Sequence, residues 1–165
     1  MATVSLRGQE FSTIGDLPQP GQKAPDFSLR KNDLTTTTLA DYDGMNVILN
    51  IFPSIDTATC ATSVRQFNER ASKLENTKVI CVSRDLPFAQ KRFCGAEGIQ
   101  NVITASDFAT GDFGRAYGVE LLDGPLRDLH ARAVVVVSPD GIVKYAELVT
   151  EIANEPNYDA AIAAL

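Results

Sequence analysis

Residues 46–74 read NVILNIFPSIDTATCATSVRQFNERASKL, and this stretch decides the fold. Its first seven residues are mostly apolar, which is typical of a strand that is covered on both faces of a sheet. Pro53 ends that strand. Beyond it, apolar residues recur at the spacing of a helix, at Val64, Phe67 and Ala71, with charged residues on the other faces. A buried strand that leads into an amphipathic helix predicts an α/β domain.

The rest of the chain predicts further strands and helices around this unit. Residues 3–14 alternate in places around Arg7–Glu10 and indicate a β-hairpin, whereas residues 118–129 have little periodicity and are expected to form a loop. Other strands are expected at 27–30, 35–39, 78–83, 102–105, 133–138 and 142–149, and other helices from residue 85, at 112–117 and at 158–165. This order favours a three-layer α/β fold with a mixed central sheet. A thioredoxin-like fold has this order, although other α/β folds share it.

Composition and charge narrow the classes of function. The chain has 165 residues, enough for one domain, which is expected to span 1–165. The net charge is −6 and the basic residues are scattered, so no nucleic-acid partner is expected. No apolar run approaches the roughly 18 residues of a membrane span. The first residues lack the apolar core of a secretion signal, so a cytoplasmic location is expected.

Three cysteines are too few for a disulfide scaffold, so a reactive one has to be identified from its surroundings. Cys60 falls in the first turn of the predicted helix, where unpaired backbone N–H groups and the helix dipole stabilise a thiolate. It also continues the apolar stripe of the helix and should point inward. Position alone leaves a structural and a reactive cysteine equally open. Cys81 lies in a predicted core strand, where burial disfavours the thiolate, and is assigned to packing.

Two cysteine-bearing segments add a second line of argument. Pro53, Thr57 and Cys60 form the pattern Pro-x-x-x-Thr-x-x-Cys, which resembles the active-site signature of the peroxiredoxins. NIFPSIDTATCATSVRQFN and DLPFAQKRFCGAEGI closely resemble bacterial thiol peroxidases, the atypical two-cysteine subfamily. RAVVVV and EPNYDAAIAAL are similar to that family too, so the likeness runs from the N-terminal hairpin to the C-terminal helix.

The resemblance implies a role for each residue near Cys60, which would attack the peroxide. Pro53 would shield the thiolate from water and fix the loop, and the Thr57 hydroxyl would bond to the thiolate and the reacting oxygens. Arg132 would hold Cys60 ionised and stabilise charge as the O–O bond breaks. Without the likeness, Thr57 is expected to be a helix cap and Arg132 a surface cation. Two other arginines, Arg115 and Arg127, are chemically suited to the same role.

The resemblance also implies that Cys94 resolves the oxidised product as a disulfide with Cys60 in the same chain. Cys94 is expected at the end of a one- or two-turn helix just before Gly95, where the chain unwinds easily. A local rearrangement is needed, because a disulfide requires Cα atoms within about 7 Å. Hydrogen peroxide and organic, especially alkyl, hydroperoxides would be the substrates and thioredoxin the reductant, with no metal or other cofactor. A homodimer with contacts near the active-site loops is implied as well.

Three alternatives remain open from the residues alone. The first is a zinc module that uses the three cysteines and His130, although no close ligand pair exists. The second is a redox-inactive interaction domain, and the third a dithiol oxidoreductase that lacks the CxxC motif. His130 is the only histidine in the chain, is expected in a loop, and has no assigned role.

Overall fold

A computed structural model describes all 165 residues, and it contains nine strands, four α-helices and one 3₁₀ helix. The strands are β1 (Thr3–Leu6), β2 (Gln9–Ser12), β3 (Ser28–Lys31), β4 (Thr36–Thr38), β5 (Asn46–Ile51), β6 (Thr77–Ser83), β7 (Ile103–Ser106), β8 (Ala133–Val137) and β9 (Val143–Leu148). The helices are η1 (Leu39–Tyr42), α1 (Ala58–Ala71), α2 (Pro87–Glu97), α3 (Asp112–Ala116) and α4 (Tyr158–Ala163).

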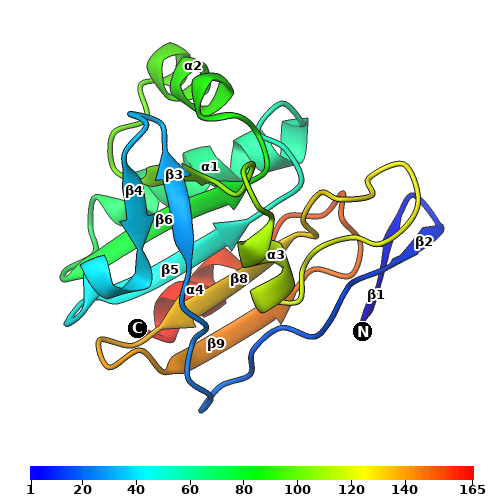
Figure 1. Cartoon of the computed structure of the whole chain (residues 1–165). Helices are drawn as coiled ribbons and strands as arrows, with labels where there is room; N and C mark the ends of the chain where they lie inside the picture. Colours follow the sequence, from blue (N-terminus) through cyan, green and yellow to red (C-terminus); the bar gives the residue numbers. More distant parts are fainter.

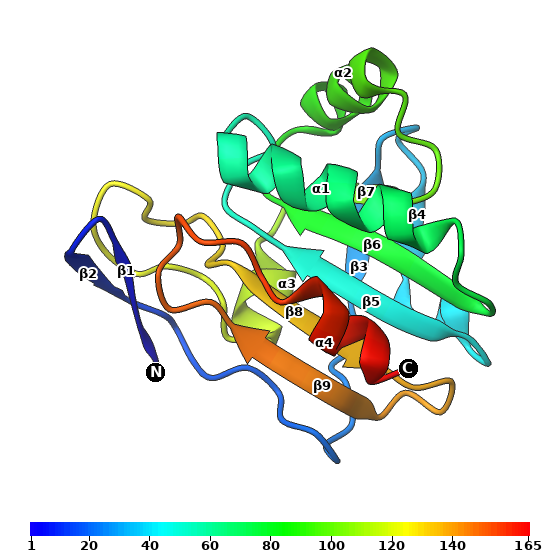
Figure 2. The same cartoon turned by 180° about the vertical axis from the view of Figure 1, so that it is seen from behind.

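Seven strands form one mixed sheet in the order β4-β3-β7-β6-β5-β8-β9. The central strands β5, β6 and β7 are parallel, whereas β8 and β9 at one side and β3 and β4 at the other pair in antiparallel fashion. Helices α1 and α4 lie together on one face (Figure 2), and α3 lies on the opposite face (Figure 1). The expected three-layer arrangement with a mixed sheet and an N-terminal hairpin is confirmed.

Alternation along the central strands divides the core into two apolar clusters. In β5, Val47, Leu49 and Ile51 face α3, while Ile48 joins the cluster beneath α1 and α4. Strand β8 alternates in the same way, with Val134 and Val136 on the α1 side. This second cluster contains all three cysteines, with Cys94 partly buried at its margin.

The hairpin of β1 and β2 lies outside the large sheet and beside the loop that precedes β8, as both ribbon views show. Its turn has left-handed backbone angles at Arg7 (φ 51°) and Gly8 (φ 87°), and the second of these favours glycine. A small apolar cluster, which includes Phe11 and Leu121, holds the hairpin against that loop. The hairpin is thereby fixed beside the end of the sheet where β5 leads into α1.

The structure corrects one expected boundary. Helix α2 spans 11 residues, about three turns, and Cys94 lies inside it rather than at its end. Gly95 continues the helix, and Gly98, with a left-handed φ of 66°, forms the C-cap. The other predicted elements lie close to their expected positions.

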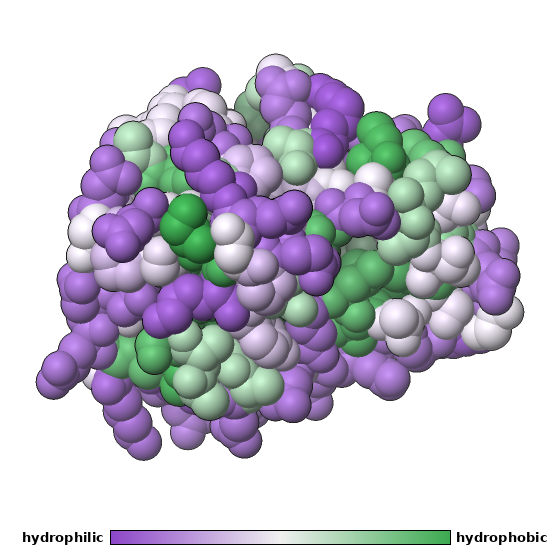
Figure 3. Space-filling model, turned by 90° about the horizontal axis from the view of Figure 1, so that it is seen from below, coloured by the Kyte–Doolittle hydropathy of each residue, from purple (hydrophilic) through white to green (hydrophobic).

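The surface seen from below in the view of Figure 1 is mostly polar, with separate apolar patches and one apolar hollow (Figure 3). None of the helices combines the length and the apolar character that crossing a lipid bilayer requires.

Candidate active site

Helix α1 begins directly behind the loop that follows β5, and it places Cys60 in its first turn. Thr57 is the N-cap residue, so Cys60 is the third helical residue, with only 1% of its surface exposed. The backbone N–H groups of Ala58, Thr59 and Cys60 donate no hydrogen bond within the protein, and that of Ala61 is the first to bond along the helix. Unpaired N–H groups at the start of a helix favour a negative charge beside them.

Arg132 supplies a cation directly beside the Cys60 sulfur. Its Nη2 donates to the Sγ of Cys60 over 3.2 Å, and its Nε donates to the carbonyl of Ile152 over 2.9 Å. The side chain is 1% exposed, and its Nη1 has no hydrogen-bond partner within the protein. A guanidinium that bonds to a buried sulfur stabilises the anionic form of that sulfur.

The sheet explains why this arginine reaches the cysteine. Arg132 precedes β8, and the alternation of that strand places it on the same side as Val134, facing α1. Strand β8 pairs with β5 so that Ala133 lies opposite Ile51. One residue further, the register brings Arg132 across from Phe52, next to the loop that opens α1. The alternative placement of Arg132 on the surface is wrong.

Pro53 and Thr57 lie on the same loop but in different environments. Pro53 is buried, whereas Thr57 is exposed, and both line a pocket of about 330 Å³ beside Cys60. The Thr57 hydroxyl donates to the carbonyl of Ser54 over 3.1 Å and does not accept from a helix N–H group. Thr57 is therefore the cap residue by position only, and its hydroxyl oxygen is not used as a cap.

Asp85 fixes this loop, and the sequence analysis gave it no such role. Its carboxylate accepts from the Ser54 hydroxyl and the Ile55 N–H, both over 2.7 Å, and from the Ser83 hydroxyl over 2.6 Å. Asp85 also directly precedes the Leu86 N-cap of α2. One carboxylate thus ties the loop before Cys60 to the start of the helix that carries Cys94. The only sequence signal was an acidic residue just before a helix start.

Cys94 is a free, half-buried thiol on α2. Its Sγ lies 3.8 Å from the Thr104 hydroxyl oxygen, and burial raises its pKa. Cys60 and Cys81 are free thiols too, so no disulfide is present.

Two ion pairs hold α2 in place. Arg65 of α1 binds Glu97 through two hydrogen bonds of 2.9 and 3.1 Å, and Arg92 binds Asp56 of the active-site loop over 2.6 Å. All four side chains are substantially exposed, so each pair contributes little to stability. These two ion pairs break at low cost, whereas the buried Phe93 and the Gln90 side chain, which donates to the Ser83 hydroxyl and the Ala105 carbonyl, anchor the same helix to the core.

The remaining candidates lie apart from this arrangement. Burial raises the pKa of Cys81 to about 12, which agrees with its assignment to packing. His130 lies outside the helices and strands as expected, yet it is fully buried and bonds to Asp107 over 2.9 Å. Arg115 binds Asp112, and Arg127 is 70% exposed, so neither contacts Cys60.

The four residues of the zinc alternative do not assemble. No group of three or more potential ligands among the histidines, cysteines and acidic residues comes close enough to hold one metal ion. His130 lies across the sheet from the cysteines, packed against Phe113.

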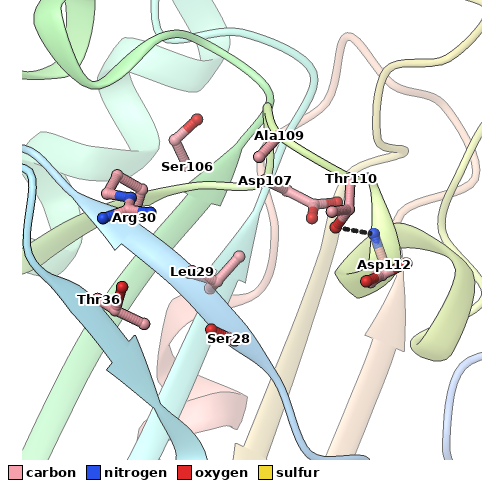
Figure 4. A pocket seen from close by; sticks show the side chains of 9 residues that line it. All are labelled: Ser28, Leu29, Arg30, Thr36, Ser106, Asp107, Ala109, Thr110 and Asp112. Atoms are coloured by element: carbon pink, nitrogen blue, oxygen red, sulfur yellow. Dashed lines mark hydrogen bonds between the residues drawn. The ribbon is translucent and has the colours of Figure 1, made fainter.

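A second pocket of about 250 Å³ lies between β3 and the start of α3 and contains no cysteine. Arg30 and Asp112 line it from different elements, with the Thr110 hydroxyl bonded to the backbone N–H of Asp112 (Figure 4). Most of its lining residues are polar, and none of them is a cysteine or a histidine. The pocket beside Cys60 is therefore the stronger candidate for chemistry.

Comparison with known proteins agrees with this geometry. The Redoxin family profile matches residues 19–162. The thiol peroxidases of Mycobacterium tuberculosis and Mycobacterium bovis are 56% identical to the chain over 165 residues, which is all of this chain and 99% of each relative. A peroxiredoxin-like protein from Aquifex aeolicus superposes with a TM-score of 0.93 at 39% identity, covering 99% of this chain and 95% of that one. The thiol peroxidase of Chromobacterium violaceum, at 21% identity and a TM-score of 0.90 over 98% of this chain and 93% of that one, shows the shared fold.

The chain therefore belongs to the redoxin family, whose thioredoxin-like fold matches the observed sheet and helices. Within that family, the relatives that it matches over its full length are thiol peroxidases. The likeness to bacterial thiol peroxidases that the two cysteine segments indicated is confirmed.

Proposed function

We propose that the protein is a thiol-dependent peroxidase that reduces hydroperoxides through Cys60. The observation that carries this proposal is the contact of 3.2 Å between the Arg132 guanidinium and the Cys60 sulfur at the open end of α1. A cation beside a buried sulfur, and unpaired N–H groups around it, favour the thiolate, which is the nucleophilic form. Full-length likeness to thiol peroxidases supports the same activity.

In the first step, the Cys60 thiolate attacks the terminal oxygen of a hydroperoxide. An S–O bond forms and the O–O bond breaks, so the sulfur is oxidised to a sulfenic acid. An alkoxide leaves and takes a proton to become an alcohol; with hydrogen peroxide the leaving group is hydroxide, which becomes water. The negative charge moves from the sulfur to the leaving oxygen. The free Nη1 of Arg132 and the N–H groups at the start of α1 are the donors available to stabilise that charge.

Pro53 and Thr57 complete the site in this proposal. Pro53 is buried and lines the pocket together with Arg132 and the first residues of α1, a position from which its ring would keep water from the sulfur. The Thr57 hydroxyl donates to the Ser54 carbonyl, so its oxygen can still accept a hydrogen bond from the hydroperoxide O–H.

In the second step, the Cys94 thiol condenses with the sulfenic acid. The sulfur atoms of Cys94 and Cys60 bond, and the hydroxyl group leaves as water with the thiol proton. Helix α2 has to rearrange for this step, because Cys94 is held within a regular helix. The ion pairs of α2 are weak and the hydrogen bond between Cys94 and Thr104 is long, which supports unwinding around Cys94, whereas the buried Gln90 keeps the first turns of the helix attached to the sheet.

An external dithiol, for which thioredoxin is the candidate, then reduces the disulfide by thiol–disulfide exchange and is itself oxidised. Hydrogen peroxide and organic hydroperoxides, including alkyl ones, are the proposed substrates. The protein is proposed to act in the cytoplasm, where such a reductant is maintained, and as a homodimer. Gel filtration with light scattering tests the dimer, and steady-state turnover with and without thioredoxin and its reductase tests the reductant.

The central experiment follows the thiols after one equivalent of peroxide is added to the reduced protein. Peptide mapping should find Cys60 and Cys94 joined and Cys81 still reduced. A Cys94→Ser variant should stop at the sulfenic acid, which a dimedone-type probe traps on Cys60, and Cys60→Ser should not consume peroxide. Cys81→Ser is the matched control and should cycle normally. Normal turnover of Cys60→Ser would overturn the role of Cys60, and failure of the wild type to consume peroxide would favour a redox-inactive domain.

A further inference from the structure

The pocket beside Cys60 has an unusual distribution of charge. It is lined by two arginines, Arg7 and Arg132, and by no acidic residue. The chain as a whole carries a net charge of −6. A cleft with only positive side chains attracts an anion even when the remaining surface repels one.

The two arginines occupy different positions. Arg132 is buried against Cys60, whereas Arg7 is exposed at the turn of the N-terminal hairpin. Apolar side chains line the same pocket, namely those of Leu6, Leu126, Leu129 and Ile152. The pocket therefore offers one cation at the sulfur, an apolar wall, and a second cation at the hairpin.

The Arg7 guanidinium is free to bind something outside the protein. It forms no hydrogen bond and no ion pair, and only the backbone N–H of Arg7 bonds to Glu151, over 3.2 Å. Glu151 is the nearby acid. Hydrogen bonds from the N–H groups of Arg7 and Ala153 and from the Ser5 hydroxyl, together with the more distant Arg7 charge, lower the pKa of its carboxylate, but it forms no ion pair with the guanidinium.

The hairpin holds Arg7 at this position. Ser5 pairs with Glu151, and the backbone N–H of Ser5 donates to the Thr150 carbonyl over 2.7 Å. The turn that carries Arg7 is thereby attached to the segment whose next two residues, Ile152 and Ala153, line the pocket. An arginine on a fixed turn loses less freedom on binding than one on a mobile segment.

The geometry points to a specificity-determining role for Arg7. We propose that Arg7 binds the anionic end, such as a carboxylate, of an organic hydroperoxide whose apolar body lies along the pocket wall and whose peroxide group reaches Cys60 and Arg132. The proposal rests on the peroxidase function proposed above. The volume of about 330 Å³ is at the small end of the range for ligand pockets, which suits a single chain rather than a bulky ring system.

The test compares a fatty-acid hydroperoxide with its methyl ester, which has the same apolar body and peroxide group but no charge. The wild type should favour the acid in kcat/KM, and Arg7→Gln should lower kcat/KM for the acid about fivefold, the upper range for an exposed ion pair. The loss should lie in KM. Turnover of the ester and of hydrogen peroxide should be unchanged. Raising the salt concentration should remove the preference of the wild type for the acid.

Arg127→Gln is the matched control, since Arg127 is an exposed arginine on the neighbouring loop that does not line the pocket. It should retain the preference for the acid. Equal kcat/KM for acid and ester in the wild type, or equal losses on both substrates in Arg7→Gln, would overturn the role of Arg7 while hydrogen peroxide turnover upholds the peroxidase function. If the wild type consumes no hydroperoxide, the proposed peroxidase function is contradicted, and binding has to test the role of Arg7 separately. Calorimetry with a medium-chain fatty acid and its neutral amide then decides the role of Arg7, and equal binding of the two contradicts it.

Discussion

Replacement of Arg132 by methionine tests the contact on which the proposed chemistry depends. Arg132→Met keeps much of the side-chain volume but removes the donor that lies 3.2 Å from the Cys60 sulfur. A hydrogen bond to a charged group contributes about 1.5–3 kcal/mol. If that interaction is realised in the attack on peroxide, its loss slows the first step roughly tenfold to 150-fold. Direct Coulomb attraction at 3.2 Å gives about 5 kcal/mol at an effective dielectric constant of about 20, which sets an upper bound.

The assay isolates the first step. Stopped-flow measurement of peroxide consumption in a Cys94→Ser background follows sulfenic acid formation without the later disulfide. Arg132→Lys should lie between the wild type and Arg132→Met, because lysine keeps the charge but not the planar donor set that also reaches Ile152. Arg115→Met and Arg127→Met should react at the wild-type rate, since both arginines lie away from Cys60.

Thermal unfolding shows whether a slower reaction of Arg132→Met comes from loss of the fold. The methionine removes a buried charge, so the fold should survive, although the Ile152 carbonyl loses a donor. If folded Arg132→Met reacts within about threefold of the wild type, which is less than the loss of one charged hydrogen bond should cause, then the guanidinium does not stabilise the reacting sulfur.

Other predictions concern the loop, helix α2 and the remaining thiols. Asp85→Asn should lower the unfolding temperature and slow sulfenic acid formation, because the amide nitrogen cannot accept from the loop; calorimetry and stopped flow measure the two effects. Glu97→Gln should speed disulfide formation by at most about fivefold, since it frees α2 from Arg65; unchanged decay of the sulfenic acid would argue against this docking role. Burial raises the pKa of Cys94, so the rate of disulfide formation should rise with pH across the alkaline range, and a flat profile would contradict attack by a thiolate. Cys81 ionises near pH 9 in the unfolded chain but near 12 when folded, so it stabilises the protein below pH 9 and that contribution is lost between pH 9 and 12; Cys81→Ala should show a smaller alkaline loss of stability in urea titrations.

The elements of the fold followed from local patterns, because a strand such as β5 or a helix such as α1 carries its periodicity in one continuous stretch. The end of α2 did not follow. Two glycines stand near that end, and sequence alone does not tell which one adopts a left-handed conformation. Gly95 continues the helix and Gly98 caps it, so Cys94 is held in a regular helix rather than at a frayed end.

The sequence predicted Cys60 and the helix start that carries it, whereas local patterns did not predict the residues that contact Cys60 and its loop. Alternation within AVVVV places Arg132 on the side of Val134 and Val136, but the sequence does not state which side α1 covers. Only the family likeness selected Arg132 over the other arginines. Asp85 and Arg7 were missed because their partners lie about 30 residues and more than 100 residues away in the chain, and such pairs leave no local pattern.

The three thiols share one apolar cluster, so the difference in their reactivity has to come from the polar groups that each sulfur contacts. Burial in an apolar environment disfavours a thiolate unless another group offsets it. The Cys81 sulfur has one hydrogen-bond partner, the Asn50 amide at 3.6 Å, and burial remains the largest influence on its pKa. Cys94 is partly buried beside the Thr104 hydroxyl and the Asn32 amide, and burial raises the pKa of its thiol. Cys60 is as buried as Cys81, yet a guanidinium and a helix start face it. Burial therefore keeps two thiols protonated and leaves the third, which alone has a cation, as the one able to react first.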